Sequence, residues 1–194
     1  MQFPCIPKQV YDNIACQHVL IPKSYGKSIK PAQLGEGIAK FFPVGTPISD
    51  SSDTLSSSSG LPKETLEPIL RAIYDEIAEI RQVCSSLEIR MVGASLLIIY
   101  EADWTRAEQS LTSSSEEEDE NDDINEDIDE DDDDDDEDED ESNSKRPGPP
   151  FVVKLIDFAH TRLAPGEGPD QGVLFGMDTL LKLLDARLEE IGAS

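Results

Sequence analysis

The chain contains 194 residues and has a formal net charge of −26, because 42 acidic residues face only 16 lysines and arginines. One segment, residues 116–141, holds 22 of these acids and leaves the rest of the chain only slightly acidic. The low isoelectric point therefore says nothing about the fold and little about the substrate. Three cysteines without a Cys-x-x-Cys spacing predict neither a disulfide framework nor a zinc site. No apolar run in the sequence is long enough for a membrane span.

The first 60 residues predict one helix. Residues 1–18 show no clear period, so we expect a poorly defined start there. A short apolar run from Leu20 leads into a turn near Gly26. Pro31 suits the first position of a helix with apolar side chains at helical spacing, and Pro43 ends that helix. Residues 45–60 are mostly Ser, Thr, Asp, Pro and Gly, which predicts a Ser-rich loop.

The longest helix and the first strand are predicted in the middle of the chain. Apolar residues recur every three or four positions from Leu66 to Leu87, which indicates a helix of about seven turns. The nearly continuous apolar run at residues 94–100 is typical of a strand that is buried on both faces. Glu101 and Asp103 end this strand.

A long acidic segment separates the first strand from the second. Residues 113–144 predict a disordered acidic insert, because mutual repulsion keeps such a tract extended and unpacked. Residues 151–156 then predict a second buried strand, which we expect to pair with the first strand in one sheet. A Gly- and Pro-rich loop at residues 165–172 precedes a closing amphipathic helix from Met177 to Ile191.

The second strand ends in Asp157, with His160 just beyond it. A carboxylate at a strand terminus is the kind of group that a hard cation such as magnesium seeks, since the ion can be shared with the phosphates of a nucleotide. Taken alone, the pattern also fits an aspartate that starts a turn or caps a helix, and a histidine with a structural role. The residues by themselves leave both interpretations open.

Several motifs in order resemble the inositol polyphosphate kinase family. The most specific one is Ile-Asp-Phe-Ala-His-Thr at residues 156–161, which matches the signature of that family in full. Residues 94–100 resemble its Ser-Ser-Leu-Leu strand, and residues 172–178 resemble its Tyr-Leu-Phe-Gly-Leu-Asp segment. Residues 22–28 and 34–42 are similar to the stretch that follows its substrate-binding region. The resemblance covers about residues 19–192, without the two low-complexity inserts.

The resemblance implies an α+β fold, namely the carboxy-terminal lobe of a protein-kinase-like enzyme built from residues 19–112 and 145–194. By this resemblance, ATP and Mg²⁺ are the cofactors and an inositol phosphate is the substrate. Asp157 would bind the magnesium ion that bridges the nucleotide phosphates, and His160 would face the phosphorylated inositol. Ser95 matches the second serine of the strand motif and would support the site, whereas Ala94 replaces the first serine.

One family motif is missing from the sequence. The Pro-x-x-x-Asp-x-Lys-x-Gly motif supplies catalytic and inositol-binding residues in the family, yet no Asp-x-Lys occurs in the 194 residues. A Gly-rich loop of the G-x-G-x-x-G type is also missing. We therefore expect that the amino-terminal lobe is absent and that the catalytic residues are incomplete. The nucleotide-binding residues are unknown. We also expect the chain alone to be inactive. The sequence leaves open whether this is an evolutionary loss or a truncation.

The acidic run at residues 116–141 has two interpretations. It is either a solvated insert or a docking segment for basic nuclear proteins, and the second interpretation makes the chain a non-catalytic binding module. In the resembling family, fungal multikinases carry an Asp-rich insert at this place and act in the nucleus. We accordingly expect a location in the nucleus, the cytoplasm or both, and no direct binding of nucleic acid.

Overall fold

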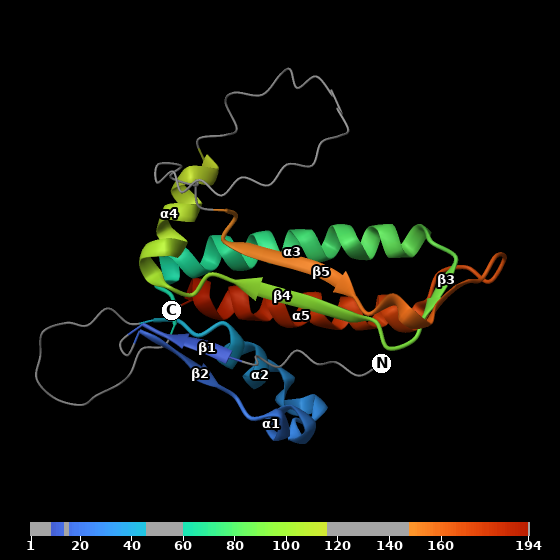
Figure 1. Cartoon of the computed structure of the whole chain (residues 1–194), viewed down its shortest axis with the longest axis horizontal. Helices are drawn as coiled ribbons and strands as arrows, with labels where there is room; N and C mark the ends of the chain where they lie inside the picture. Colours follow the sequence, from blue (N-terminus) through green and yellow to red (C-terminus); the bar gives the residue numbers. More distant parts are fainter. Residues whose placement is uncertain (1–8, 14–15, 46–59, 116–147, 194) are drawn as a thin grey trace, which may run out of the picture.

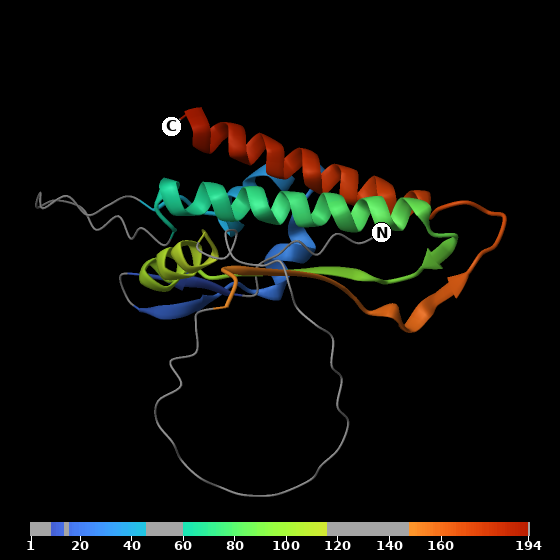
Figure 2. The ribbon, with the colours of Figure 1, turned by 90° about the horizontal axis from the view of Figure 1, so that it is seen from above.

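Two long helices and a two-stranded sheet form the centre of the molecule. The computed structural model describes residues 9–13, 16–45, 60–115 and 148–193. Helices α3 (Lys63–Ser86) and α5 (Gln171–Ala193) lie side by side and pack against strands β4 (Ser95–Tyr100) and β5 (Phe151–Ile156). In the view of Figure 2 the helices lie on one side of this sheet. The α+β class predicted from the sequence agrees with this arrangement.

Smaller elements surround this centre (Figure 1). They are β1 (Gln9–Asp12), β2 (Gln17–Leu20), α1 (Lys23–Ser28), the 3-10 helix η1 (Pro31–Gln33), α2 (Leu34–Phe41), β3 (Ile89–Met91), α4 (Trp104–Ser115), the 3-10 helix η2 (Phe158–His160) and β6 (Thr161–Leu163). Strands β1 and β2 form an antiparallel hairpin, and β3 pairs antiparallel with β6.

Helix α3 confirms the predicted seven-turn helix. The spacing of its apolar residues places one stripe toward the core, and Leu66, Ile69, Leu70, Ile73 and Ile77 are fully buried there. Leu184 and Ile191 of α5 belong to the same cluster. Burying a large aliphatic side chain contributes about 1.5–3 kcal/mol, so each member of this cluster stabilises the fold.

The two predicted strands pair as expected. Strands β4 and β5 are antiparallel, with Ser95 opposite Ile156 at one end and Tyr100 opposite Phe151 at the other. The prediction that both faces are buried is wrong. Side chains alternate between the faces of a strand, and only the face with Leu96, Ile98 and Val153 packs on the helices.

Other local predictions need correction. The expected poorly defined start contains the hairpin β1–β2, whose strands are too short to show a period. The expected turn near Gly26 is the short helix α1. Helix α4 was not predicted, and it includes residues 113–115, which the sequence assigned to the acidic insert. Helix α5 begins at Gln171, inside the expected loop at 165–172, because Asp170 caps it.

An aromatic cluster joins α2 to the sheet. Phe42 is fully buried, and its ring lies 5.2 Å from that of Tyr100. The Tyr100 hydroxyl donates a hydrogen bond of 2.7 Å to the carbonyl of Phe41, and burial raises the pKa of this hydroxyl. The Arg187 guanidinium of α5 donates to the carbonyl of Phe42. These contacts satisfy the polar groups at the end of α2.

Two sequence-based predictions lie outside the described residues. They are the Ser-rich loop, apart from its end residues 45 and 60, and the acidic run at residues 116–141. Docking of basic nuclear proteins on that run, and the nuclear or cytoplasmic location, therefore stay predictions. No helix in the described part of the chain is long and apolar enough to cross a membrane.

Candidate active site

Asp157 directly follows strand β5, as the sequence predicted. Its backbone is in the left-handed region, with φ 68° and ψ 51°, which few side chains other than those of Asn and Asp adopt. The side chain is exposed, and within the described ranges its carboxylate has no hydrogen bond or ion pair. A strained backbone that presents a free carboxylate is a feature of functional sites.

Asp157 lies where the pairing is interrupted between two strand pairs, and we call this interruption, residues 92–94 and 157–160, the bulge. Strands β3 and β6 pair up to Met91 opposite Thr161, and β4 and β5 pair from Ser95 opposite Ile156. The two connections thus place residues 92–94 opposite residues 157–160, so that the second connection has one residue more. Such bulges re-aim side chains and are frequent next to active sites.

The structure brings the three predicted site residues to this bulge. Ser95 is half-buried and pairs with the residue that precedes Asp157. His160 lies in η2, and its carbonyl accepts a hydrogen bond of 3.3 Å from the amide of Val92. The side chain of His160 is exposed. Carboxylate, hydroxyl and imidazole therefore come from two segments that lie next to each other.

The sheet face that points away from the helices is apolar and leads to Asp157. Leu97, Ile99 and Val152 are 37%, 55% and 36% exposed on this face, and Ile156 is half-buried. Lys154 lies in register with Leu97 and adds a positive charge. We call these five residues and Ser95 the outer face of the sheet. This face therefore places apolar side chains and one lysine next to the Asp157 end of the sheet.

Asp170 supports the bulge and was not among the site residues predicted from the sequence. Its carboxylate accepts hydrogen bonds from the amides of Met91, Gly172 and Val173 at 3.1, 3.0 and 3.2 Å. Burial alone would raise the pKa of Asp170, but these hydrogen bonds and the charge of Arg90 outweigh burial and lower it. An aspartate immediately before an apolar helical run is a cap signal that could have identified this residue.

Arg90 holds the loop before Asp170. Its guanidinium donates hydrogen bonds of 2.8 Å to the carbonyls of Glu167 and Gly168, and it forms an ion pair with the Glu167 carboxylate at 3.4 Å. Strand β3 is thereby joined to the loop that leads into α5. Asp170 and Arg90 together keep one side of the bulge in place.

A metal ion at Asp157 would need ligands from elsewhere. No group of three or more His, Cys, Asp or Glu side chains within the described ranges is arranged to hold a metal ion. Asp157 itself supplies carboxylate oxygen atoms, which magnesium and manganese prefer as ligands. Phosphate oxygens and water molecules complete the coordination shell of such ions in many nucleotide sites.

Comparison with known proteins identifies the family. Residues 6–185 match the profile of the family described as inositol polyphosphate kinase, so the chain belongs to this family. It is 33% identical to the inositol polyphosphate multikinase of Saccharomyces cerevisiae over 171 residues. This alignment covers 86% of this chain and 44% of the yeast protein. Over 183 residues it is 26% identical to mouse inositol hexakisphosphate kinase 3, covering 91% of this chain and 35% of that protein.

Solved structures show the same fold. The inositol phosphate multikinase Ipk2 of S. cerevisiae, in complex with ADP and Mn²⁺, matches with a TM-score of 0.56 and 22% identity over 93% of this chain and 55% of that one. A second inositol phosphate multikinase structure gives a TM-score of 0.53 and 16% identity over 92% and 58%. The family predicted from the sequence is confirmed, and the chain spans less than half the length of the two curated relatives.

Proposed function

We propose that this chain is the part of an inositol polyphosphate kinase that holds the metal-bound phosphates of ATP and the inositol phosphate that receives the γ-phosphate. The observation that carries the proposal is the free, exposed carboxylate of Asp157 in a left-handed bulge, at the end of an apolar sheet face. Family membership supports the reaction class.

Asp157 would bind magnesium. An anionic oxygen at the strand end can share the ion with two phosphate groups of the nucleotide, and the ion neutralises charge that develops during phosphoryl transfer. One solved relative is described as a complex with ADP and Mn²⁺, which supports the use of a nucleotide and a divalent ion.

The outer face of the sheet would receive the nucleotide base. Ile156 is the partner of Ser95 at the Asp157 end, and Leu97 lies two residues from Ser95 on the same face, so a base on these side chains would lie beside the metal-bound phosphates. Burial of their exposed apolar surface would contribute about 25 cal/mol per Å². The Ser95 hydroxyl can donate a hydrogen bond to a phosphate or accept one from a metal-bound water.

His160 would bind the inositol phosphate. Its imidazole is exposed three residues beyond Asp157, on the same connection, and an imidazole N–H can donate to a phosphate oxygen. An inositol phosphate held by His160 would then lie close to the end of the sheet where Asp157 would hold the ion. Such an arrangement would bring the acceptor hydroxyl and the γ-phosphate together, which is the main requirement of phosphoryl transfer.

We further propose that the 194 residues alone do not catalyse the transfer. The sequence contains no Asp-x-Lys motif, and the chain covers 44% of the yeast multikinase. Transfer requires a clamped nucleotide as well as a metal carboxylate, because positioning and charge neutralisation act together. The remaining groups would come from parts that correspond to the rest of the relatives.

A chimera tests the proposal. The matching part of the yeast multikinase is replaced by this chain, and transfer of labelled phosphate from ATP to inositol phosphates is measured. We expect transfer by the chimera and none by the chain alone. Asp157→Asn should lower turnover about 100-fold or more, since Asn keeps the shape but loses the charge that holds the ion. His160→Ala should raise the KM for the inositol phosphate about tenfold and leave the KM for ATP unchanged.

Asp185→Asn is the matched control, because Asp185 is exposed on α5 and the same charge is removed there. It should leave turnover and both KM values unchanged. Near-normal turnover of the Asp157→Asn chimera would exclude the metal role. Transfer by the purified 194-residue chain would contradict the proposal that further parts are needed.

A further inference from the structure

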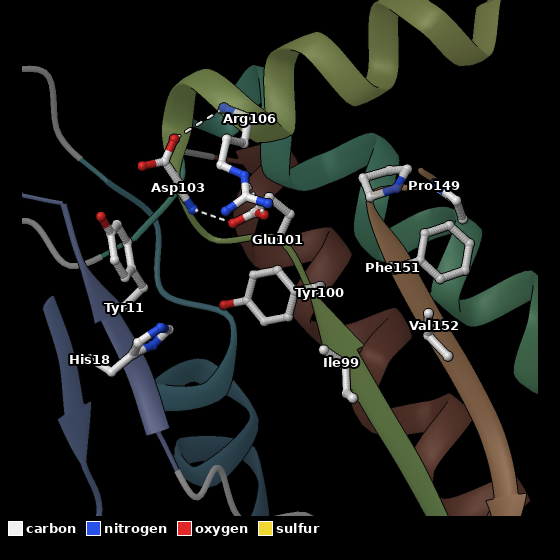
Figure 3. A pocket seen from close by; sticks show the side chains of 11 residues that line it. Tyr11, His18, Ile99, Tyr100, Glu101, Asp103, Arg106, Pro149, Phe151 and Val152 are labelled. Carbon is white, nitrogen blue, oxygen red and sulfur yellow. Dashed lines mark hydrogen bonds and ion pairs between the residues drawn. The ribbon is translucent and has the colours of Figure 1, made fainter. Parts of the chain in front are cut away.

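A cavity lies at the end of the central sheet that is opposite to Asp157. It has a volume of about 420 Å³ and lies between the hairpin β1–β2 and the start of β5 (Figure 3). The register of the sheet separates it from the candidate active site, since Tyr100 and Phe151 line the cavity and Ser95 and Ile156 form the other end. Its volume is within the range of small-ligand pockets.

Aromatic rings form two walls of the cavity. Tyr11 and His18 are cross-strand partners in β1–β2, with ring centroids 5.2 Å apart and ring planes at 65°. Neither ring belongs to the hydrophobic core. Tyr100 and Phe151, whose side chains also pack against the core, line the cavity from the sheet, and in Figure 3 the space lies between the hairpin rings and the sheet.

Two carboxylates lie at the same cavity. Glu101 accepts a hydrogen bond of 3.0 Å from the amide of Asp103 and forms an ion pair of 3.3 Å with Arg106. Asp103 accepts a hydrogen bond of 3.0 Å from the amide of Arg106. Partial burial, and then the charges of Cys16 and Asp103, raise the pKa of Tyr11, which also shares a hydrogen bond with Asp103. Two carboxylates against one guanidinium leave the lining negative.

The carboxylates keep capacity for a further donor. Each has about four lone-pair positions, of which the observed contacts use only a part. The Arg106 side chain is 74% exposed, and an ion pair with such an exposed partner is worth about 0–1 kcal/mol. An incoming cation can therefore share Glu101 with Arg106 or displace Arg106 at little cost.

The walls are held in fixed positions. Asn13, just after β1, donates a hydrogen bond of 2.8 Å to the carbonyl of Ala102 and accepts one of 3.0 Å from the amide of Trp104. The indole of Trp104 donates to the carbonyl of Gly60 at 2.6 Å. The hairpin is thereby tied to the first turn of α4, and a preorganised cavity loses less conformational entropy on binding.

We propose that this cavity binds an arginine side chain of a partner polypeptide. A guanidinium stacks on aromatic faces and forms paired hydrogen bonds with a carboxylate, and the cavity offers both kinds of partner. The apolar parts of Ile99 and Val152, which also belong to the far end of the outer face, contact the methylene stem. Phosphates are repelled by the negative lining, so this site is distinct from the phosphate site proposed at Asp157.

The test is a titration of the whole chain with N-acetylarginine amide, followed by the NMR signals of the rings of Tyr11, His18 and Phe151. We expect saturable shifts at these rings. The matching citrulline compound is neutral and nearly the same shape, and it should cause no such shifts at the same concentrations. No saturable shift with the arginine compound, or equal shifts with citrulline, would overturn the proposal.

Paired variants locate the site. Glu101→Gln keeps an acceptor for the Asp103 amide but removes the charge, and it should weaken arginine binding about tenfold. Glu108→Gln removes the same charge from an exposed position of α4 and should leave binding unchanged. Both variants keep the acidic run, so a difference between them cannot come from attraction of arginine to residues 116–141. His18→Ala, on an exposed strand, is a second cavity variant that should weaken binding. Equal affinities of Glu101→Gln, His18→Ala and Glu108→Gln, or ring shifts caused by ATP instead of arginine, would contradict the proposal.

Discussion

Asp157 combines an unfavourable backbone conformation with a free carboxylate. A left-handed backbone costs a residue with a Cβ atom about 1–2 kcal/mol relative to a right-handed one, and glycine escapes this cost. The neighbouring Phe158 is 52% exposed, so apolar packing of this side chain gives little compensation. The surrounding strand pairs must hold the conformation, which is consistent with a residue kept for its chemistry and not for stability.

The backbone conformation can be tested independently of the metal. Asp157→Gly and Asp157→Ala both remove the carboxylate, but only glycine adopts φ 68° without strain. We expect the glycine variant to be more stable than the alanine variant by about 1 kcal/mol. Urea unfolding of both variants measures the difference in the free energy of unfolding. An alanine variant as stable as the glycine variant would show that the bulge is not strained.

At the residue scale, the sequence indicated candidate site residues but not the local geometry that surrounds them. An apolar strand followed by Asp157 and His160 indicated a candidate metal site. The bulge could not be predicted, because it depends on the register of β3 and β6, which have three residues each and no visible period. Asp170 had a local signal as a helix cap, but its bond to the Met91 amide is a tertiary contact.

The start of α5 links two structural elements through one carboxylate. Asp170 caps the helix and also accepts a hydrogen bond from β3. Loss of a cap costs about 0.5–2 kcal/mol, and an unsatisfied backbone amide adds to this cost. Helix position and bulge geometry therefore depend on the same side chain.

Asp170→Ala should lower the free energy of unfolding by about 2 kcal/mol. The measurement is thermal or urea unfolding of the whole chain, with Asp185→Ala as the control at an exposed position of the same helix. The control should change stability by less than about 0.5 kcal/mol. If both variants lose the same stability, the cap and the contact with Met91 contribute nothing specific.

The contact between α3 and α5 includes an ion pair with a pH-dependent contribution. Arg81 donates hydrogen bonds of 2.8 and 3.2 Å to the two carboxylate oxygens of Asp178, and these bonds hold the pKa of Asp178 below its usual value. A group with a lowered pKa in the folded state stabilises the fold above its unfolded pKa of about 3.9. This contribution is lost as the pH falls through the folded pKa.

Asp178→Asn should therefore be less stable than the natural chain at about pH 6, and the difference should shrink below about pH 4. Unfolding free energies of both proteins across this range give the difference directly. Added salt should reduce it at pH 6, because the side chains are 36% and 41% exposed. A difference that stays constant down to about pH 2 would exclude a contribution from the charge of Asp178.

At the scale of the whole molecule, strong periodicity decided what the sequence could predict. Helix α3, helix α5 and the paired strands β4 and β5 follow from long apolar patterns. The hairpin β1–β2 and helix α4 depend on tertiary contacts, such as those of Asn13 with Ala102 and Trp104. The exposure of Leu97 and Ile99 was unpredictable from the run of apolar residues, since it depends on which sheet face the helices cover.

The central claim is that Asp157 places a divalent ion at the end of the sheet, and the position of such an ion on the whole chain tests it most directly. Manganese broadens NMR signals of nearby nuclei, so a titration with Mn²⁺ in the presence of ADP locates bound ions residue by residue. In the natural chain we expect broadening of the amide signals of Ser95, Ile156 and Phe158. Ions attracted to residues 116–141 should cause broadening there as well. In Asp157→Asn the signals of Ser95, Ile156 and Phe158 should stay sharp, and the broadening at residues 116–141 should be unchanged. Signals of Ser95 and Ile156 that stay sharp in the natural chain, or broaden equally in the variant, would contradict the claim.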